Sequence, residues 1–247
     1  MTLPSIKHPL FTVVLPLSKK KITYRPFLVN EKKILMIANE SGQKEDMQRA
    51  VFQVVQNCIV PSESVANWPT VDLHYMFYTI RSKSIGETAD FILTCKGCKG
   101  KIPYTFDFTK IYVDEIDKNL LNIPIKDKIG VVMKFPDCSL EGKIPENAPL
   151  NEKVDLLLLN CIDYIYDENQ IYYAKDVEAT ELKQFIDNLP VEVHNRMESS
   201  IMTSPKVKYK DTYVCKHCNA KDELKLDNLI DFFTSAALTK ASNPTTK

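Results

Sequence analysis

The chain has 247 residues, of which 44% are hydrophobic and 26% are charged, a composition typical of a globular protein. Its 32 basic and 32 acidic residues cancel, which counts against a protein whose main role is to bind a polyanion. No run of 18 apolar residues is present and the first residues lack an apolar core, so we expect neither a membrane-spanning helix nor a signal peptide.

Residues 1–85 are expected to form a β-hairpin followed by helices. β-Branched and aromatic residues fill residues 10–16 and 21–28, and a Ser-Lys-Lys turn separates these two segments. This pattern predicts two paired strands. Apolar residues at helical spacing then predict three helices. The first helix begins after a cap at Asn30. The second covers residues 44–58, and the third covers 71–83 after a cap at Thr70.

Two short cysteine pairs are the most informative feature of the chain. They are Cys95-Lys-Gly-Cys98 and Cys215-Lys-His-Cys218, and strand-like sequence lies on both sides of each. The flanking segments are 88–94, 101–108, 206–214 and 222–226. A strand, a Cys-x-x-Cys turn and a second strand form the repeating half of a zinc ribbon. We therefore expect residues 86–110 and 205–227 to join in one zinc-ribbon-like region.

Residues 111–204 are expected to form a mixed, largely helical insertion between the two cysteine pairs. Short β-like runs occur at 111–116 and 129–135, and a loop rich in proline follows over 136–149. Helices are predicted over 152–166, 180–188 and 190–202, with Tyr172-Tyr173 in a connector. After the second cysteine pair, residues 228–247 are expected to contain a helix over 228–239 and a frayed tail. The predicted fold class is α+β.

Cys95, Cys98, Cys215 and Cys218 supply four thiolates, a complete ligand set for one tetrahedral Zn²⁺. The spacing within each pair lets both sulfurs reach one ion at about 2.3 Å. Linking the two pairs is a weaker inference, because ordinary ribbons separate their pairs by about 15–20 residues. A site with four protein ligands has no open position for water or substrate, so the predicted zinc is structural.

Other roles for these cysteines stay open at this point. A thioredoxin-like redox pair would lie at the N-terminus of a helix, whereas both pairs here run into strands. Unligated structural cysteines are a second alternative. His217 lies inside the second pair and offers another metal ligand, although four cysteines already complete the site. The surrounding lysines would offset the negative charge of a zinc tetrathiolate. They are Lys96, Lys99, Lys101, Lys216 and Lys221.

No sequence motif indicates an enzyme. Phosphate-binding glycine loops, a nucleophile elbow and a zinc-protease motif are all missing, and the chain has only six glycines. Cys58 and Cys161 occupy apolar positions of predicted helices, where buried packing is the simplest interpretation.

Several segments resemble tail proteins of T4-like contractile bacteriophages, which are described as baseplate hub subunits or hub assembly proteins. The resemblance begins with Ile22–Ser41 (ITYRPFLVNEKKILMIANES), which is similar to a family block YRPFLV-x-E-x-K-x-L-x-x-A-x-E-S. It continues through Phe77–Glu87, the strand entering Cys95, Ile129–Pro136, and the C-terminal Cys-x-x-Cys with its following Phe-Phe. The resemblance covers most of the chain and implies a virion protein or an assembly factor in the host cytoplasm.

The sequence and the resemblance together predict a structural or assembly protein of a phage tail baseplate. It would act through contacts with other baseplate or hub proteins, without nucleic acid or a membrane span. The N-terminal hairpin and the last predicted helix, with Phe232 and Phe233, are candidate contact surfaces, and core packing is the other interpretation of both. The alternative function is a zinc-ribbon protein that binds nucleic acid or acts in transcription. A lysine stripe would then carry the contact: Lys206, Lys208, Lys210 and Lys216.

Overall fold

The structure is a computed structural model that describes residues 6–115, 117–140 and 148–226. Two compact units make up the chain. Unit 1 contains the described parts of Met1–Val65, Val71–Asp114 and Lys206–Lys247. Unit 2 contains Ala66–Thr70 and the described part of Glu115–Pro205. The fold is mixed α+β, which confirms the predicted class.

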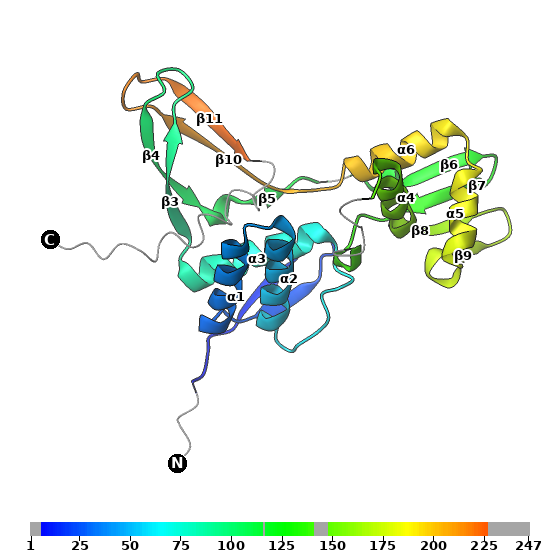
Figure 1. Ribbon diagram of the computed structural model, residues 1–247, viewed down its shortest axis with the longest axis horizontal. Coiled ribbons are helices and arrows are strands. Elements are labelled where there is room, and N and C mark those ends of the chain that lie inside the picture. The colour runs from blue at the N-terminus through cyan, green and yellow to red at the C-terminus, as the bar shows by residue number, and fades with distance from the viewer. Residues whose placement is uncertain (1–5, 116, 141–147, 227–247) are drawn as a thin grey trace, which may run out of the picture. The chain divides into compact units, whose positions relative to one another are not determined.

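The N-terminal part of unit 1 is the predicted hairpin followed by helices (Figure 1). Strands β1 (Phe11–Val14) and β2 (Lys21–Tyr24) pair in antiparallel register, as their β-branched and aromatic residues favour. The helices are α1 (Val29–Ser41), α2 (Lys44–Cys58) and α3 (Thr70–Ile85). Helices α2 and α3 bury the apolar faces that their periodicity predicts, and the Cys58 thiol is fully buried. Helix α1 buries Leu35 and Ala38, but Ile37, which belongs to its predicted apolar stripe, is 70% exposed.

The predicted cap at Asn30 is wrong. Helix α1 begins two residues earlier than this cap implies, at Val29, with Leu28 in the N-cap position. The Glu31 carboxylate accepts a hydrogen bond of 2.8 Å from the Leu28 amide, and it forms an ion pair of 3.1 Å with Arg25. A carboxylate in the first turn therefore satisfies the helix terminus in place of an asparagine cap. Similarly, α5 begins at Ala179 after Glu178, one residue before the predicted start at 180.

Two β-hairpins form the rest of unit 1 (Figure 1). The first joins β3 (Thr88–Thr94) to β4 (Lys101–Asp107), and a short 3₁₀ turn (Phe108–Lys110) follows it. The second joins β10 (Val207–Val214) to β11 (Lys221–Leu226), and β5 (Tyr112–Val113) pairs with the start of β10. Aromatic side chains pack between the hairpins, with the rings of Phe106 and Tyr209 stacked 3.9 Å apart.

Unit 2 is a four-stranded antiparallel sheet in the order β6-β7-β8-β9 with helices α4, α5 and α6. A hydrophobic core joins the helices to one face of the sheet and includes Ile123, Val131, Leu158, Ile186 and Met197. The strands are β6 (Asn122–Lys126), β7 (Ile129–Met133), β8 (Ile162–Tyr166) and β9 (Ile171–Tyr173). The helices are α4 (Leu150–Cys161), α5 (Ala179–Asp187) and α6 (Val191–Met202). Short 3₁₀ turns lie at Lys118–Leu121, Cys138–Leu140 and Ala174–Asp176.

Three predictions for the insertion need correction. The helix predicted over 152–166 ends at Cys161, and Ile162–Tyr166 is a strand that pairs with both β7 and β9. Because Cys161, Ile162 and Ile165 keep a helical spacing, the sequence does not reveal the change from helix to strand. Pairing with strands on both sides outweighs this local helical preference. Tyr172-Tyr173 is part of strand β9, not a connector, and strand β6 was not predicted. Cys161 is fully buried, as expected, in the core of unit 2.

The helix predicted over 228–239 lies outside the described residues. In the described part of the chain, no helix has the length and apolar character needed to cross a bilayer.

Asp137 gives unit 2 a stability term that depends on pH. Its carboxylate accepts hydrogen bonds from the amide and hydroxyl of Ser139 and from Lys134 at 3.1 Å. Although desolvation raises the pKa of Asp137, these partners together lower it below its ordinary value. The stabilisation is therefore present above the ordinary pKa of about 4 and is lost as the pH falls below it.

We expect Asp137→Asn to lower the free energy of unfolding of unit 2 by about 1–3 kcal/mol at pH 6, and by clearly less at pH 3. The single tryptophan, Trp68, is a suitable probe because it is buried and its carbonyl accepts a hydrogen bond from the Cys138 amide. Urea unfolding followed by Trp68 fluorescence at both pH values measures the difference. An equal difference at both pH values would contradict this account of Asp137.

Candidate metal centre

The four predicted cysteines lie together at the tips of the two hairpins in unit 1. Cys95, Cys98, Cys215 and Cys218 place their sulfur atoms within 4.8 Å of one another. The Cys95–Cys218 and Cys98–Cys215 sulfur pairs are separated by 3.8 and 3.6 Å. Four sulfurs about 2.3 Å from a tetrahedral Zn²⁺ stand about 3.8 Å apart, so the cluster has the size that a zinc ion requires.

The two turns that carry the cysteines have the same backbone structure. In the first, the Lys99 amide bonds to the Cys95 carbonyl and the Cys95 amide bonds to the Gly100 carbonyl. In the second, Asn219 and Ala220 make the equivalent bonds to Cys215, also near 2.9 Å. The residue after each second cysteine is left-handed, with φ of 59° at Lys99 and 56° at Asn219. Each turn therefore holds its two sulfurs in the same way, so that the site consists of two turns with the same backbone conformation.

Backbone amides also point at the sulfurs of Cys95 and Cys215. These two cysteines are buried, whereas Cys98 and Cys218 are exposed. Hydrogen bonds from the amides of Cys98 and Gly97 lower the pKa of the Cys95 thiol to about 6. The Gly100 amide lowers the pKa of Cys98, but desolvation and the neighbouring thiols outweigh it and raise that pKa to about 11. Binding of a cation therefore displaces protons from the cluster.

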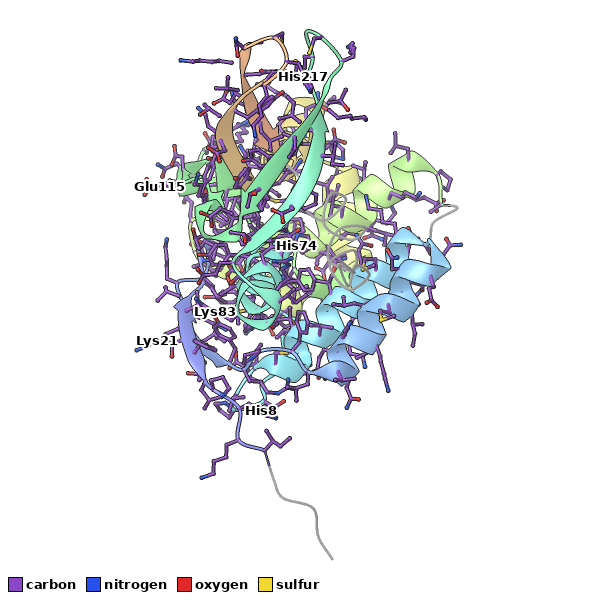
Figure 2. All side chains as sticks on the ribbon, turned by 90° about the vertical axis from the view of Figure 1, so that its left-hand side faces the viewer. His8, Lys21, His74, Lys83, Glu115 and His217 are labelled. Carbon is purple, nitrogen blue, oxygen red and sulfur yellow. The ribbon has the colours of Figure 1, made fainter. Side chains whose placement is uncertain are left out.

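His217 is not needed as a ligand and instead joins the two hairpins. Its ring lies against Gly100 of the first hairpin, and its Nε2 atom is 3.2 Å from the Lys101 carbonyl oxygen. Figure 2 shows His217 at the hairpin tips. A Cβ atom at residue 100 would lie 2.7 Å from the His217 ring, so the two turns approach closely only because residue 100 is glycine.

The close approach at Gly100 gives a matched pair of variants. We expect Gly100→Ala to push the His217 ring away and to weaken metal binding at least about tenfold, because the two turns can no longer hold the sulfurs together. Gly97→Ala is the control, since its Cβ would meet only the Cys95 sulfur at an ordinary 3.9 Å. Competition with a chromogenic zinc chelator measures both affinities. Equal affinities for the two variants would contradict the role given to Gly100.

A polar cluster links the same two hairpins away from the sulfurs. The hydroxyls of Tyr104 and Tyr209 are 2.6 Å apart, and both contact the carboxylate of Asp211, which also binds Lys110 at 3.0 Å. Desolvation raises the pKa of Asp211, but Lys110 and the hydroxyls more than offset it and lower the pKa to about 2. Asp211 therefore stays ionised and holds β4 to β10. Sequence reasoning missed this cluster because 107 positions separate Tyr104 from Asp211.

Several lysines of the hairpins form ion pairs with carboxylates. Lys96 of the first turn forms an ion pair of 3.0 Å with Asp222 of β11, which adds a third link between the hairpins. In the predicted stripe, Lys208 pairs with Asp114 and Lys210 pairs with Glu223 at 2.8 Å. These pairs neutralise half of the stripe and weaken the nucleic-acid interpretation.

Residues 8–234 match the profile of the family described as T4 bacteriophage base plate protein. The chain belongs to this family. The match spans both units and the cysteine cluster, so the resemblance noted in the sequence is confirmed at the level of the base plate family. No curated protein and no solved structure is similar enough to this base plate protein to be matched.

Proposed function

We propose that this base plate protein is a structural or assembly component of the central hub of a phage tail, and that it acts through contacts with other baseplate proteins. The family match over residues 8–234 is the observation that carries the proposal. The segments that resemble hub proteins, Ile22–Ser41 and Phe77–Glu87, support the finer assignment to the hub. The protein would then be in the virion, or in the host cytoplasm during assembly.

We further propose that Cys95, Cys98, Cys215 and Cys218 bind one structural Zn²⁺. The spacing of the sulfurs supports this, because it matches a tetrahedral tetrathiolate site. Four sulfur ligands leave no coordination position for a substrate, so the ion would stabilise the two hairpins and would not catalyse a reaction. The domain roles follow from this proposal: residues 86–110 with 205–227 are a rigid ribbon, and 111–204 are an insertion carried by it.

The N-terminal hairpin is the proposed contact surface within the described residues. Leu10 precedes β1 and Val14 is its last residue, and they are 56% and 55% exposed, which leaves apolar area available to a partner. The second candidate surface, with Phe232 and Phe233, lies outside the described residues.

Mass spectrometry of purified phage particles and of purified hub intermediates tests the hub assignment. A hub subunit is expected in both at a fixed ratio to other hub proteins, whereas an assembly factor is expected only in the intermediates. Detection of the chain only in baseplate parts outside the hub would refute the assignment. Metal analysis of the purified protein tests the ion independently, and one zinc per chain is expected.

The alternative as a nucleic-acid-binding ribbon is tested by retention on immobilised DNA and RNA as salt is lowered. Phosphate-driven binding is strongest at low salt. No retention at low salt removes the alternative, and retention that falls steeply with salt would support it.

A further inference from the structure

The sheet of unit 2 has one face that its helices leave uncovered. The helix-covered face carries the row Ile123, Val131, Ile165 and Tyr172 across the four strands. The opposite face carries two cross-strand rows. One row is Asn122, Val132, Tyr164 and Tyr173, and the other is Pro124, Gly130, Tyr166 and Ile171. This second face is therefore rich in tyrosine towards the β9 edge of the sheet.

The two edges of this sheet differ in how they are protected. At the β6 edge, Pro124 lacks an amide hydrogen, its carbonyl accepts a hydrogen bond from Arg196, and the register shifts beside it. These are features that prevent a further strand from adding to a sheet edge. At the β9 edge, the sequence Ile171-Tyr172-Tyr173 has no proline and no charge, and the three residues are 52%, 37% and 47% exposed. The β9 edge is thus open.

The hairpin register determines which backbone groups of β9 point outwards. The Asp167 amide bonds to the Gln170 carbonyl, so residues 167 and 170 form a hydrogen-bonded pair. Pairs alternate along an antiparallel ladder, so Tyr172 bonds to Ile165, whereas Ile171 and Tyr173 direct their N–H and C=O groups away from β8. Outside the helices and strands, no backbone hydrogen bond of the described residues uses these outward groups, and the Tyr173 carbonyl stands at the start of the 3₁₀ turn Ala174–Asp176.

We propose that β9 pairs with β9 of a second copy of this chain, antiparallel, about a two-fold axis at Tyr172. Only this register places Ile171 opposite Tyr173 of the other copy on both sides of the axis. Each such pair exchanges both of its N–H···O bonds, so every outward group of both strands is satisfied. The four strands of each copy then form one continuous sheet.

The side chains agree with this register. Within one copy, β9 already places Ile171 beside Tyr166 and Tyr173 beside Tyr164, whose rings are 5.8 Å apart. The two-fold axis would repeat this pattern, because it places Ile171 of each copy beside Tyr173 of the other on the face that the helices leave uncovered. Tyr172 would meet its own counterpart, an aromatic pair of the kind that stabilises neighbouring strands. The inference is independent of the cysteine site, since all of these residues belong to unit 2.

Sedimentation equilibrium of the full-length protein with Tyr173→Pro and Tyr173→Val tests the proposal. The backbone of Tyr173, with φ of −71°, suits proline, so Tyr173→Pro removes the outward donor without requiring a new backbone conformation. We expect the wild type to dimerise with increasing concentration. Tyr173→Pro should associate at least about a hundredfold more weakly, because the bond is lost on both sides of the axis, and Tyr173→Val should remain within about tenfold of wild type.

A charge swap at the axis tests the register itself and does not depend on the proline variant. Residue 172 faces itself, so Tyr172→Glu and Tyr172→Lys are each expected to be monomeric through repulsion between like charges, whereas an equimolar mixture of the two should form the dimer. A wild type that stays monomeric at every concentration would overturn the proposal. A wild-type dimer that survives Tyr173→Pro, or a mixture that fails to associate, would also overturn it.

Discussion

Removal of the proposed Zn²⁺ is expected to unfold the two hairpins of unit 1. Structural zinc sites contribute on the order of 10 kcal/mol to folding, which exceeds what a pair of short hairpins gains from packing alone. Cys215→Ser should have the same effect, because Cys215 is fully buried and a serine hydroxyl is a poor substitute for a thiolate. Metal content by plasma emission and thermal unfolding by circular dichroism measure both consequences.

Cys161→Ala is the control for this substitution. Cys161 is also fully buried, but it lies in the core of unit 2, away from the metal site. Its truncation should destabilise unit 2 by about 1–2 kcal/mol and leave the zinc content unchanged. If Cys215→Ser kept one zinc per chain and the wild-type melting temperature, the cluster would have no structural role as a metal site. The tyrosine–Asp211 contact would then be the main link between the hairpins.

The second large effect is expected at Asp72, a carboxylate with no exposed surface in the first turn of α3. Its two oxygens accept hydrogen bonds of 2.9 Å from the amides of Leu17 and Ser18, at the turn between β1 and β2. Asp72→Ala leaves both amides without an acceptor and should lower the free energy of unfolding by about 2–5 kcal/mol. Chemical denaturation followed by circular dichroism measures the loss.

A matched control for Asp72 is Asp46, which is also acidic and also lies in the first turn of a helix. The Asp46 side chain is 36% exposed and forms an ion pair with Arg49 on the helix surface. Asp46→Ala should therefore change stability by about 0.5 kcal/mol or less. Similar losses for the two variants would show that the helix terminus, and not the buried contact with the hairpin turn, accounts for the effect of Asp72.

The elements that the sequence predicted well are those whose signals are local. Helix α2 and strand β3 were predicted at their observed bounds, because periodicity and turn residues marked both ends. The pairing of the two cysteine turns was also predicted, since tetrahedral zinc requires four ligands and each turn supplies two. In these regions the local preference and the tertiary structure agree.

The errors occur where tertiary pairing decides the structure. Ile162–Tyr166 continues the helical apolar spacing of α4, yet it is a strand because β7 and β9 pair with it on both sides. The contact of Gly100 with His217 could not be predicted either, because it depends on the distance between two turns that are far apart in the chain. Neither feature has a signal in the neighbouring residues.

The two cysteine pairs are far apart in the sequence, and this separation determines when during synthesis the four-cysteine site can form. A ribosome makes Cys95 and Cys98 more than 100 residues before it makes Cys215 and Cys218. A product that stops between the two pairs therefore holds only two of the four cysteines of the cluster. The proposed ion would be bound tightly only by a chain translated past residue 218, so metal uptake would distinguish chains that contain all four cysteines from chains that stop before Cys215.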